Sequence, residues 1–216
     1  MSTYKNIIFD LDGTLLDTSQ GIFNSVRYTE DSLGIEHMPE EDLHLHVGPP
    51  VLYAYEKFHN LDEDTARKAV KFHREYSTSK GIYEAEVYDG IPKLLKNLKD
   101  SGFKLYVATL KRQDLAEKIL EHFQISQYFD LIVGINNAES LSKADMINII
   151  LSGIDNDKKS TILIGDSEFD AIGAAEAGID CLAVTYGFGF KSEDDIKNNK
   201  IKYIAKNICD IRDFFV

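Results

Sequence analysis

Six polar residues stand where the pattern predicts that the chain leaves a strand or enters a helix: Asp10, Asp12, Thr109, Lys143, Asp166 and Asp170. A carboxylate can attack an electrophile, transfer a proton or bind a hard cation, and a lysine or a hydroxyl can bind an anion. Asp10 and Asp12 follow the apolar residues 7–9 and precede a Gly-Thr pair. Two interpretations of this pair are open: a polar turn after a buried strand, or two carboxylates placed for chemistry.

The elements that would position these residues are predicted from short apolar runs. These runs are almost continuous rather than alternating, which is typical of strands buried on both faces. They occupy residues 7–9, 103–109, 129–134, 161–165 and 181–185. Helical periodicity separates them, for example at 114–123 and 142–151. This alternation predicts an α/β fold with a doubly wound, parallel, Rossmann-like sheet, in which ligands bind beyond the carboxyl ends of the strands.

Residues 18–85 interrupt the alternation, because they show helical patterns only. A segment of this length is too long for a simple crossover between two strands. We therefore expect two domains: a core of residues 1–17 and 86–216, and an inserted, all-helical domain of residues 18–85.

A parallel sheet would gather the six polar residues at one edge. Carboxylates held close together repel one another unless a cation lies among them. Oxygen ligands beside a phosphate suit Mg²⁺ in particular. The pattern therefore predicts a magnesium site, and its candidate ligands are Asp10, Asp12, Asp166 and Asp170.

The net charge limits the partners that the protein can have. The 216 residues include 24 basic and 36 acidic ones, for a formal charge of −12. This balance argues against a nucleic-acid polymer or a membrane surface as partner, because both require clustered Lys and Arg. A small phosphate ligand needs only one or two cations and some backbone N–H groups. No apolar run approaches the roughly 20 residues of a membrane span, and the polar start MSTYKN does not fit a signal peptide. We expect a cytoplasmic protein, either a monomer or a homodimer.

Four motifs in this order carry a resemblance to a known family: DLDGT from residue 10, Thr109, Lys143 and GDSEFD from residue 165. Together they resemble the motifs of the haloacid dehalogenase-like hydrolases, along essentially the whole chain. The resemblance implies that Asp10 is the nucleophile and forms an aspartyl-phosphate, while Asp12 serves as general acid and then as general base. It also implies that Mg²⁺ is bound by Asp10, by the backbone carbonyl of Asp12 and by Asp166.

The resemblance implies roles for the remaining motif residues as well. Thr109 and the N–H of Leu110 are expected to bind phosphate oxygens, and Lys143 to balance the charge of Asp10 and the phosphate. Asp170 is expected to bind the metal through water or to pair with Lys143. A simple helix N-terminal charge remains an alternative for Asp170, because acids suit that end of a helix.

Candidate substrate contacts lie partly outside the motifs. The family commonly has Thr-Ser-Lys in the second motif, whereas this chain has leucine at 110. Lys111 is then a candidate to contact the leaving group or a second phosphate, with a solvated lysine as the alternative. In the helical insertion, Asn24, Arg27 and Gly48 are candidates to face the substrate, with a surface role equally open for Arg27.

Several shorter segments favour one branch of the family. HVGPP at 46–50, YDGIP at 88–92 and VTYGFG at 184–189 resemble the 5′-nucleotidase-like or phosphoglycolate phosphatase-like branch. Its members act on small-molecule phosphate esters. We read Gly187 and Gly189 as a turn rather than a phosphate loop. A phosphomutase of the β-phosphoglucomutase type and a non-catalytic binding or regulatory protein on the same fold remain alternatives.

Overall fold

The computed structural model describes residues 3–135, 141–190 and 201–215. The chain forms two compact units, one with the residues up to Leu16 and from Val87 onward, the other with Asp17–Glu86. We call them the core unit and the helical unit. Two short paired strands, β2 (Leu16–Asp17) and β3 (Glu86–Val87), lie where the chain passes between the units.

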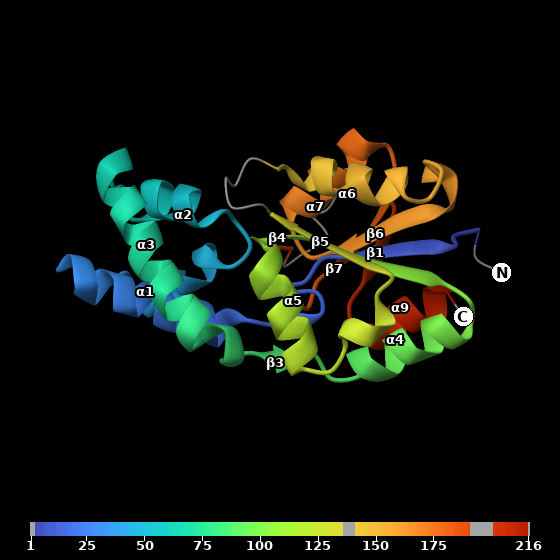
Figure 1. Ribbon diagram of the computed structural model, residues 1–216, viewed down its shortest axis with the longest axis horizontal. Coiled ribbons are helices and arrows are strands. Elements are labelled where there is room, and N and C mark those ends of the chain that lie inside the picture. The colour runs from blue at the N-terminus through green and yellow to red at the C-terminus, as the bar shows by residue number, and fades with distance from the viewer. Residues whose placement is uncertain (1–2, 136–140, 191–200, 216) are drawn as a thin grey trace. The chain divides into compact units, whose positions relative to one another are not determined.

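The core unit is built on a six-stranded sheet (Figure 1) with the order β5-β4-β1-β6-β7-β8. All neighbouring pairs in this sheet are parallel, which confirms the predicted doubly wound α/β fold. The strands are β1 (Asn6–Phe9), β4 (Lys104–Arg112), β5 (Leu131–Ile135), β6 (Thr161–Gly165), β7 (Asp180–Val184) and β8 (Tyr203–Ala205). Strand β1 is central and completely buried, as its continuous apolar run predicts.

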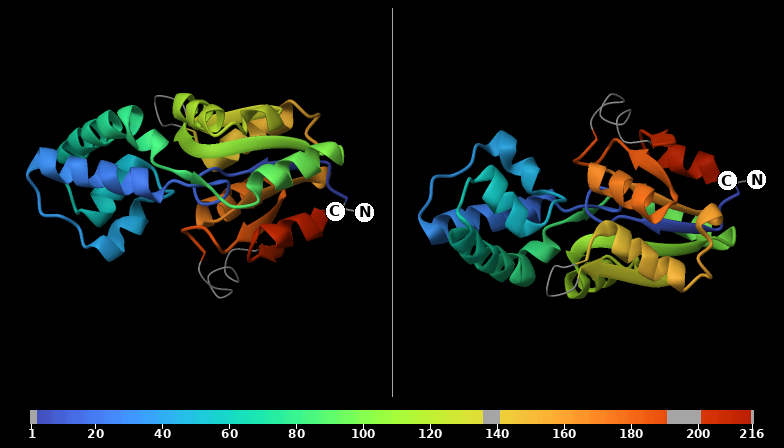
Figure 2. Two further views of the ribbon diagram at one scale, coloured as in Figure 1. Left: turned by 90° about the horizontal axis from the view of Figure 1, so that it is seen from below. Right: turned by 90° about the horizontal axis from the view of Figure 1, so that it is seen from above.

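Helices cover both faces of this sheet (Figures 1 and 2). One face carries α6 (Lys143–Ser152) and α7 (Glu168–Ala177). The other carries α4 (Ile91–Asp100), α5 (Gln113–His122) and α9 (Ile208–Phe215). Short 3₁₀ helices η3 (Ser126–Tyr128) and η4 (Lys158–Ser160) precede β5 and β6. Successive strand residues point to opposite faces, so Ile8 packs toward α6 and α7 while Ile7 and Phe9 are buried on the other side.

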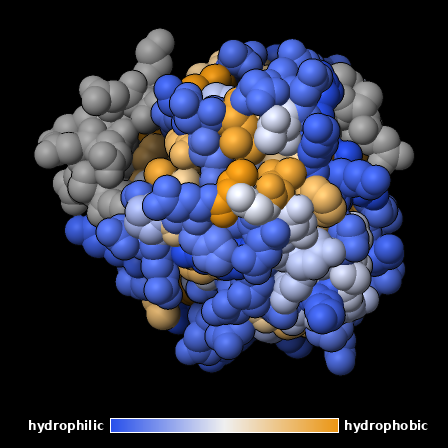
Figure 3. Space-filling model, turned by 90° about the vertical axis from the view of Figure 1, so that its left-hand side faces the viewer, coloured by the Kyte–Doolittle hydropathy of each residue, from blue (hydrophilic) through white to orange (hydrophobic). Residues whose placement is uncertain are grey.

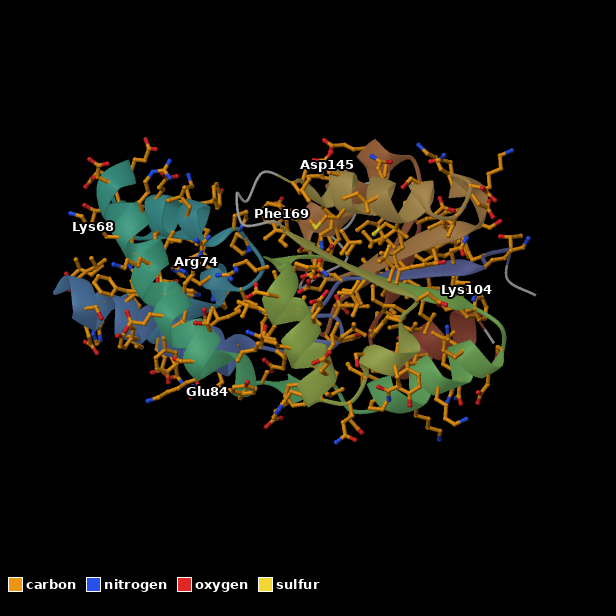
Figure 4. All side chains as sticks on the ribbon, viewed as in Figure 1. Lys68, Arg74, Glu84, Lys104, Asp145 and Phe169 are labelled. Atoms are coloured by element: carbon orange, nitrogen blue, oxygen red, sulfur yellow. The ribbon has the colours of Figure 1, made fainter. Side chains whose placement is uncertain are left out.

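Polar side chains at the starts of α6 and α7 hold these two helices in place. At α6, Ser142 accepts a hydrogen bond from the N–H of Asp145, and the Asp145 carboxylate (labelled in Figure 4) accepts one from the N–H of Ser142. At α7, the Asp170 carboxylate accepts hydrogen bonds from both the N–H and the hydroxyl of Ser167. Hydrogen bonds of this kind satisfy polar groups that a helix start leaves unpaired. They therefore fix where Lys143 and Asp170 emerge.

The helical unit contains three α-helices and two 3₁₀ helices: α1 (Ser19–Leu33), η1 (Glu40–His46), α2 (Val51–Phe58), α3 (Glu63–Ser79) and η2 (Gly81–Tyr83). Apolar residues at helical spacing give it a core of its own. One cluster joins Val26, Met38 and Leu43, and a second joins Tyr55 to the small residues of α3. The α-helical patterns predicted between residues 18 and 85 correspond to α1, α2 and α3.

A group of charged and titratable side chains is also buried in the helical unit. Glu30 is fully buried, accepts a hydrogen bond from the N–H of Met38 at 2.7 Å and pairs with Arg27 at 2.8 Å. His46 and His59 are buried nearby, and their Nε2 atoms have no hydrogen-bond partner among the described residues. Burial lowers the pKa of both rings, to about 3 for His46. The fold of the helical unit therefore disfavours protonation of both rings.

The molecular surface agrees with the high content of charged residues. The face shown in Figure 3 is mostly hydrophilic, and its apolar side chains gather mainly in its middle and upper part. Among the described residues, no helix combines the length and the apolar character needed to cross a bilayer.

Candidate active site

The carboxyl ends of three neighbouring strands build the candidate site. Strands β4, β1 and β6 lie side by side, with Phe9 in register with Val107 and Ile164. Asp10 comes directly after β1, and its N–H still donates to the carbonyl of Ile164 at 2.9 Å. Asp166 comes directly after β6. Parallel pairing thus brings residues that are far apart in the sequence to one edge of the sheet, as the topology predicts.

Lys143 contacts both the motif that begins at Asp10 and the motif that contains Asp170. Its Nζ donates to Asp10 Oδ1 at 2.6 Å and to the carbonyl of Ala108 at 3.0 Å, and it lies 2.8 Å from Asp170 Oδ1 as an ion pair. All three charged side chains are almost fully buried. Burial opposes the charge of Lys143, but the attraction of the two carboxylates raises its pKa above the usual value. Lys143 is therefore a fixed ammonium whose donors are directed at the motif residues.

The carboxylates outnumber this one cation. Asp10, Asp166 and Asp170 each offer an oxygen, and these oxygens lie within 4.8 Å of one another. Burial raises the pKa of Asp10 well above its usual range despite the neighbouring Lys143, and burial together with Asp170 raises the pKa of Asp166 to about 6. Asp170 Oδ1 is buried and makes no aligned hydrogen bond. An oxygen cluster with excess negative charge is suited to a divalent cation.

Asp12 lies in a different environment from Asp10. Its two carboxylate oxygens accept hydrogen bonds from Lys111 Nζ at 3.0 and 3.1 Å. Both side chains of this pair are partly accessible, at 16% for Lys111 and 12% for Asp12. Gly13, which follows, has a φ of +83°, a value that glycine adopts readily and that turns the chain away from the strand direction. Two carboxylates only two residues apart therefore have different cationic partners.

Strand β4 continues beyond the point predicted for its end. The apolar pattern predicts that the strand ends at Thr109, which is wrong, because β4 extends to Arg112 with an irregularity after Thr109. Thr109 is buried, and its hydroxyl accepts a hydrogen bond from the N–H of Lys111 at 3.1 Å. Leu110 is half-buried against the apolar cluster below α6. Thr109, Leu110 and Lys111 thus lie together at the same sheet edge.

The segment around Gly187 and Gly189 contacts the site, which the sequence reasoning missed. The N–H groups of Phe188 and Gly189 donate to Asp166 Oδ2 at 2.6 and 3.1 Å, and the N–H of Phe190 donates to the carbonyl of Asp166 at 2.7 Å. A Cβ at Gly189 would lie 2.5 Å from that carbonyl oxygen. The glycines therefore permit a close approach of backbone to Asp166. The two glycines shortly after a buried strand could have indicated a close backbone contact, but they do not indicate that the contact is with Asp166.

The candidate residues of the helical unit make contacts within that unit. Asn24 donates to Glu84 at 2.9 Å, and Glu84 is labelled near the lower end of α3 in Figure 4. Arg27 donates to the carbonyl of Met38 and pairs with a buried carboxylate, so it has a structural role there. Gly48 has a φ of +104°, and a Cβ at this position would meet nothing within 4 Å. Substrate contact by Asn24 and Gly48 stays a prediction.

The chain is similar to known proteins over almost its full length. The model of the haloacid dehalogenase-like hydrolases matches residues 7–184. A 5′-nucleotidase of Pseudomonas aeruginosa is 36% identical over 210 residues, which cover 97% of this chain and 94% of that protein. The tyrosine-protein kinase PtkA of Mycobacterium tuberculosis is 33% identical, over 96% of this chain and 71% of that protein. The crystal structure of a predicted phosphatase from Clostridium acetobutylicum has a TM-score of 0.91 at 39% identity, with 97% of each chain covered. This chain therefore belongs to the haloacid dehalogenase-like hydrolases.

Proposed function

We propose that the protein is a Mg²⁺-dependent phosphatase that hydrolyses small phosphate monoesters, of the 5′-nucleotide or phosphoglycolate type, through an aspartyl-phosphate. The observation that carries this proposal is the separation of two neighbouring carboxylates. Asp10 is buried and held by Lys143 at 2.6 Å, whereas Asp12 is partly accessible and paired with Lys111. Carboxylates in different environments can take different roles in one reaction.

In the first half of the reaction, the Asp10 carboxylate attacks phosphorus and the bond from phosphorus to the ester oxygen breaks. Asp12, as general acid, gives its proton to the leaving oxygen, so that a neutral alcohol departs. Thr109 and the N–H of Leu110 bind the phosphoryl oxygens. Lys143 neutralises part of the charge that Asp10 and the phosphoryl group share.

In the second half, the ionised Asp12 takes a proton from a water molecule. The resulting hydroxide attacks phosphorus, the bond to the Asp10 oxygen breaks, and inorganic phosphate leaves. Asp10 is regenerated as a carboxylate, and Asp12 carries the proton needed for the next cycle.

The acidic cluster would hold the metal ion. Asp10, Asp166 and Asp170 would supply carboxylate oxygens, and the backbone carbonyl of Asp12 would supply a further oxygen. When bound, Mg²⁺ would draw negative charge from the phosphoryl oxygens and make phosphorus more electrophilic. The hydrogen bonds from Phe188 and Gly189 hold one oxygen of Asp166 and leave its other oxygen for the cation.

We assign the choice of substrate and the exclusion of water to the helical unit, acting as a cap. A phosphoryl-enzyme must be shielded during its formation and reached by water afterwards, which a movable lid permits. Asn24 and Gly48 are the residues of this unit proposed to contact substrate. Their contribution is tested by the ester preference of single-site variants.

Phosphate release from a panel of phosphoglycolate, nucleoside 5′-monophosphates and sugar phosphates tests the proposal. Asp10→Asn should abolish release, EDTA should silence the wild type, and added Mg²⁺ should restore it. Asp12→Asn should slowly accumulate a phosphorylated protein, detected by mass spectrometry, because its first step lacks the general acid and its second step lacks the general base. Asp100→Asn, an exposed change on α4, is the matched control. Full turnover by Asp10→Asn would refute the mechanism.

The same panel separates the alternatives. A phosphomutase would convert one sugar phosphate into its isomer, and a non-catalytic protein would release no phosphate from any ester. A single preference of about 100-fold in kcat/KM, equivalent to about 2.7 kcal/mol, would name the substrate.

A further inference from the structure

We infer that Lys111 selects substrates whose leaving group carries a negative charge next to the scissile oxygen. This inference rests on the proposed function and narrows its substrate class. Such substrates include phosphoglycolate and phosphoanhydrides, in which a carboxylate or second phosphate adjoins the broken bond. Nucleoside 5′-monophosphates, whose leaving group is a neutral nucleoside, lack this charge.

Two lysine side chains place their ammonium groups at the site. Lys143 directs its ammonium at Asp10, Asp170 and the carbonyl of Ala108, all of them buried. Among the described residues, Lys111 is the other lysine paired with a motif carboxylate, and its ammonium donates to both oxygens of Asp12. Lys111 also remains 16% accessible. It is thus the ammonium that an incoming anion can reach.

The local backbone of β4 sets the direction of the Lys111 side chain. Thr109 pairs with Gly134, and the next pair joins Arg112 to Ile135, so two residues of β4 bulge between these pairs. Within this bulge, the hydroxyl of Thr109 accepts a hydrogen bond from the N–H of Lys111. A bulge redirects a side chain that would otherwise follow the strand alternation.

Two residues next to the bulge, Gly134 and Gln113, support its conformation. A Cβ at Gly134 would lie 2.7 Å from the carbonyl oxygen of Lys111, so only glycine leaves room for it. The side chain of Gln113 replaces the missing strand pairing, because it donates to the carbonyl of Ile132 at 3.0 Å and accepts the N–H of Gly134 at 2.6 Å. The Lys111 backbone is therefore held from both sides.

Asp12 relates the position of Lys111 to that of the leaving oxygen. As general acid, the Asp12 carboxyl must reach the leaving oxygen within hydrogen-bond distance. Lys111 Nζ already lies 3.0 Å from the same carboxylate. The leaving oxygen and the ammonium are therefore on the order of 5 Å apart, two hydrogen-bond lengths. An anionic group one or two atoms beyond the leaving oxygen would meet Lys111, and a charge-assisted hydrogen bond would form.

A matched pair of esters tests this inference. Phosphoglycolate and 2-hydroxyethyl phosphate have similar size, but only the first carries a carboxylate. We expect the wild type to prefer phosphoglycolate in kcat/KM by roughly 10- to 100-fold, the range of a hydrogen bond to a charged group. Lys111→Met should lose most of this preference, and Lys111→Arg should keep part of it. Lys118→Met, an exposed change on α5, should leave the preference unchanged.

The ratio of the two esters isolates the proposed contact. Any disturbance of Asp12, or any loss of folded protein, lowers both rates in one sample and cancels in the ratio. Failure of the wild type to hydrolyse either ester, or any other ester of the panel, would overturn the proposed function itself. Hydrolysis of both esters with a wild-type ratio near one, or with an unchanged ratio in Lys111→Met, would overturn the inference and leave the phosphatase assignment standing.

Discussion

Replacing Lys143 by methionine should destabilise the metal-free protein strongly. Methionine keeps much of the length of the side chain but removes the ammonium that lies 2.6 Å from Asp10 and 2.8 Å from Asp170. Both carboxylates are buried, so water cannot replace the lost partner. Removing one member of a buried ion pair costs about 3–5 kcal/mol, because the remaining charge stays uncompensated.

This cost is large beside the stability of an ordinary domain, about 5–15 kcal/mol. For a chain of this size each kcal/mol shifts the melting temperature by about 2–4 °C, so Tm should fall by about 6–20 °C. The loss should be greater at pH 8 than at pH 5. Burial raises the pKa of Asp10 while the charge of Lys143 opposes that rise, so the variant lacks this opposing effect. A group whose folded-state pKa lies above its unfolded value loses stability as pH rises.

The assay is thermal unfolding in EDTA, followed by circular dichroism, with three companion variants. Lys96→Met is the exposed control, because Lys96 and Asp100 form a surface pair whose side chains are more than 60% accessible. Its effect should stay below about 1 kcal/mol. Asp170→Asn and the double variant Lys143→Met/Asp170→Asn complete a double-mutant cycle. The free energy of unfolding lost by the double variant should be smaller than the sum of the two single losses by about 1 kcal/mol or more. The reason is that the double variant removes one of the uncompensated charges.

Two results would refute this reasoning. One is a Lys143→Met protein whose Tm in EDTA matches that of Lys96→Met. The other is a strictly additive cycle, which would mean that Lys143 and Asp170 do not interact.

Two further predictions concern the loop beside Asp166 and the helical unit. Gly189→Ala should weaken Mg²⁺ binding by about 10-fold or more in calorimetry, because its Cβ collides with the backbone that supports Asp166, whereas Gly153→Ala, with only an ordinary contact, should not. Equal Mg²⁺ affinities would contradict the support role. The pKa of His46 is lowered to about 3, so the unfolded chain binds the proton more readily and stability falls as pH drops below about 6.5. Between pH 7.5 and 5.5 this costs about 1.4 kcal/mol. In chemical unfolding, the free energy of unfolding of His46→Leu should lack that part of the pH dependence. A pH dependence identical to that of the wild type would disprove the prediction.

Much of the fold could be predicted from the pattern of apolar residues. The strands at residues 7–9 and 161–165 and the helices at 114–123 and 142–151 are found within one or two residues of the predicted limits. Strand β8 has three residues and α9 has eight, so neither extends far enough to give a clear periodic signal. Strand β4 was predicted too short because its last three residues follow an irregularity rather than a continuous apolar run.

The candidate site could be predicted less completely. Its motif residues follow from a rule of topology, since carboxyl ends of adjacent parallel strands share one edge. The partners of these residues do not follow from that rule. Lys111 and Asp12 are 99 positions apart, and Asp166 and Phe188 are 22 apart, and no local pattern relates them. The buried histidines of the helical unit also gave no signal, because a single histidine in a helix is compatible with an exposed or a buried position.

The sequence by itself determined the parallel order of strand and helix and the motif residues at the strand ends. Both depend on local properties, namely apolar periodicity and the residue that follows each strand. The tertiary structure decided which cation each carboxylate receives: Lys143 for Asp10 and Asp170, and Lys111 for Asp12. A charge pair depends on the distance between side chains from separate segments, and that distance exists only after the helices and the bulged strand have packed.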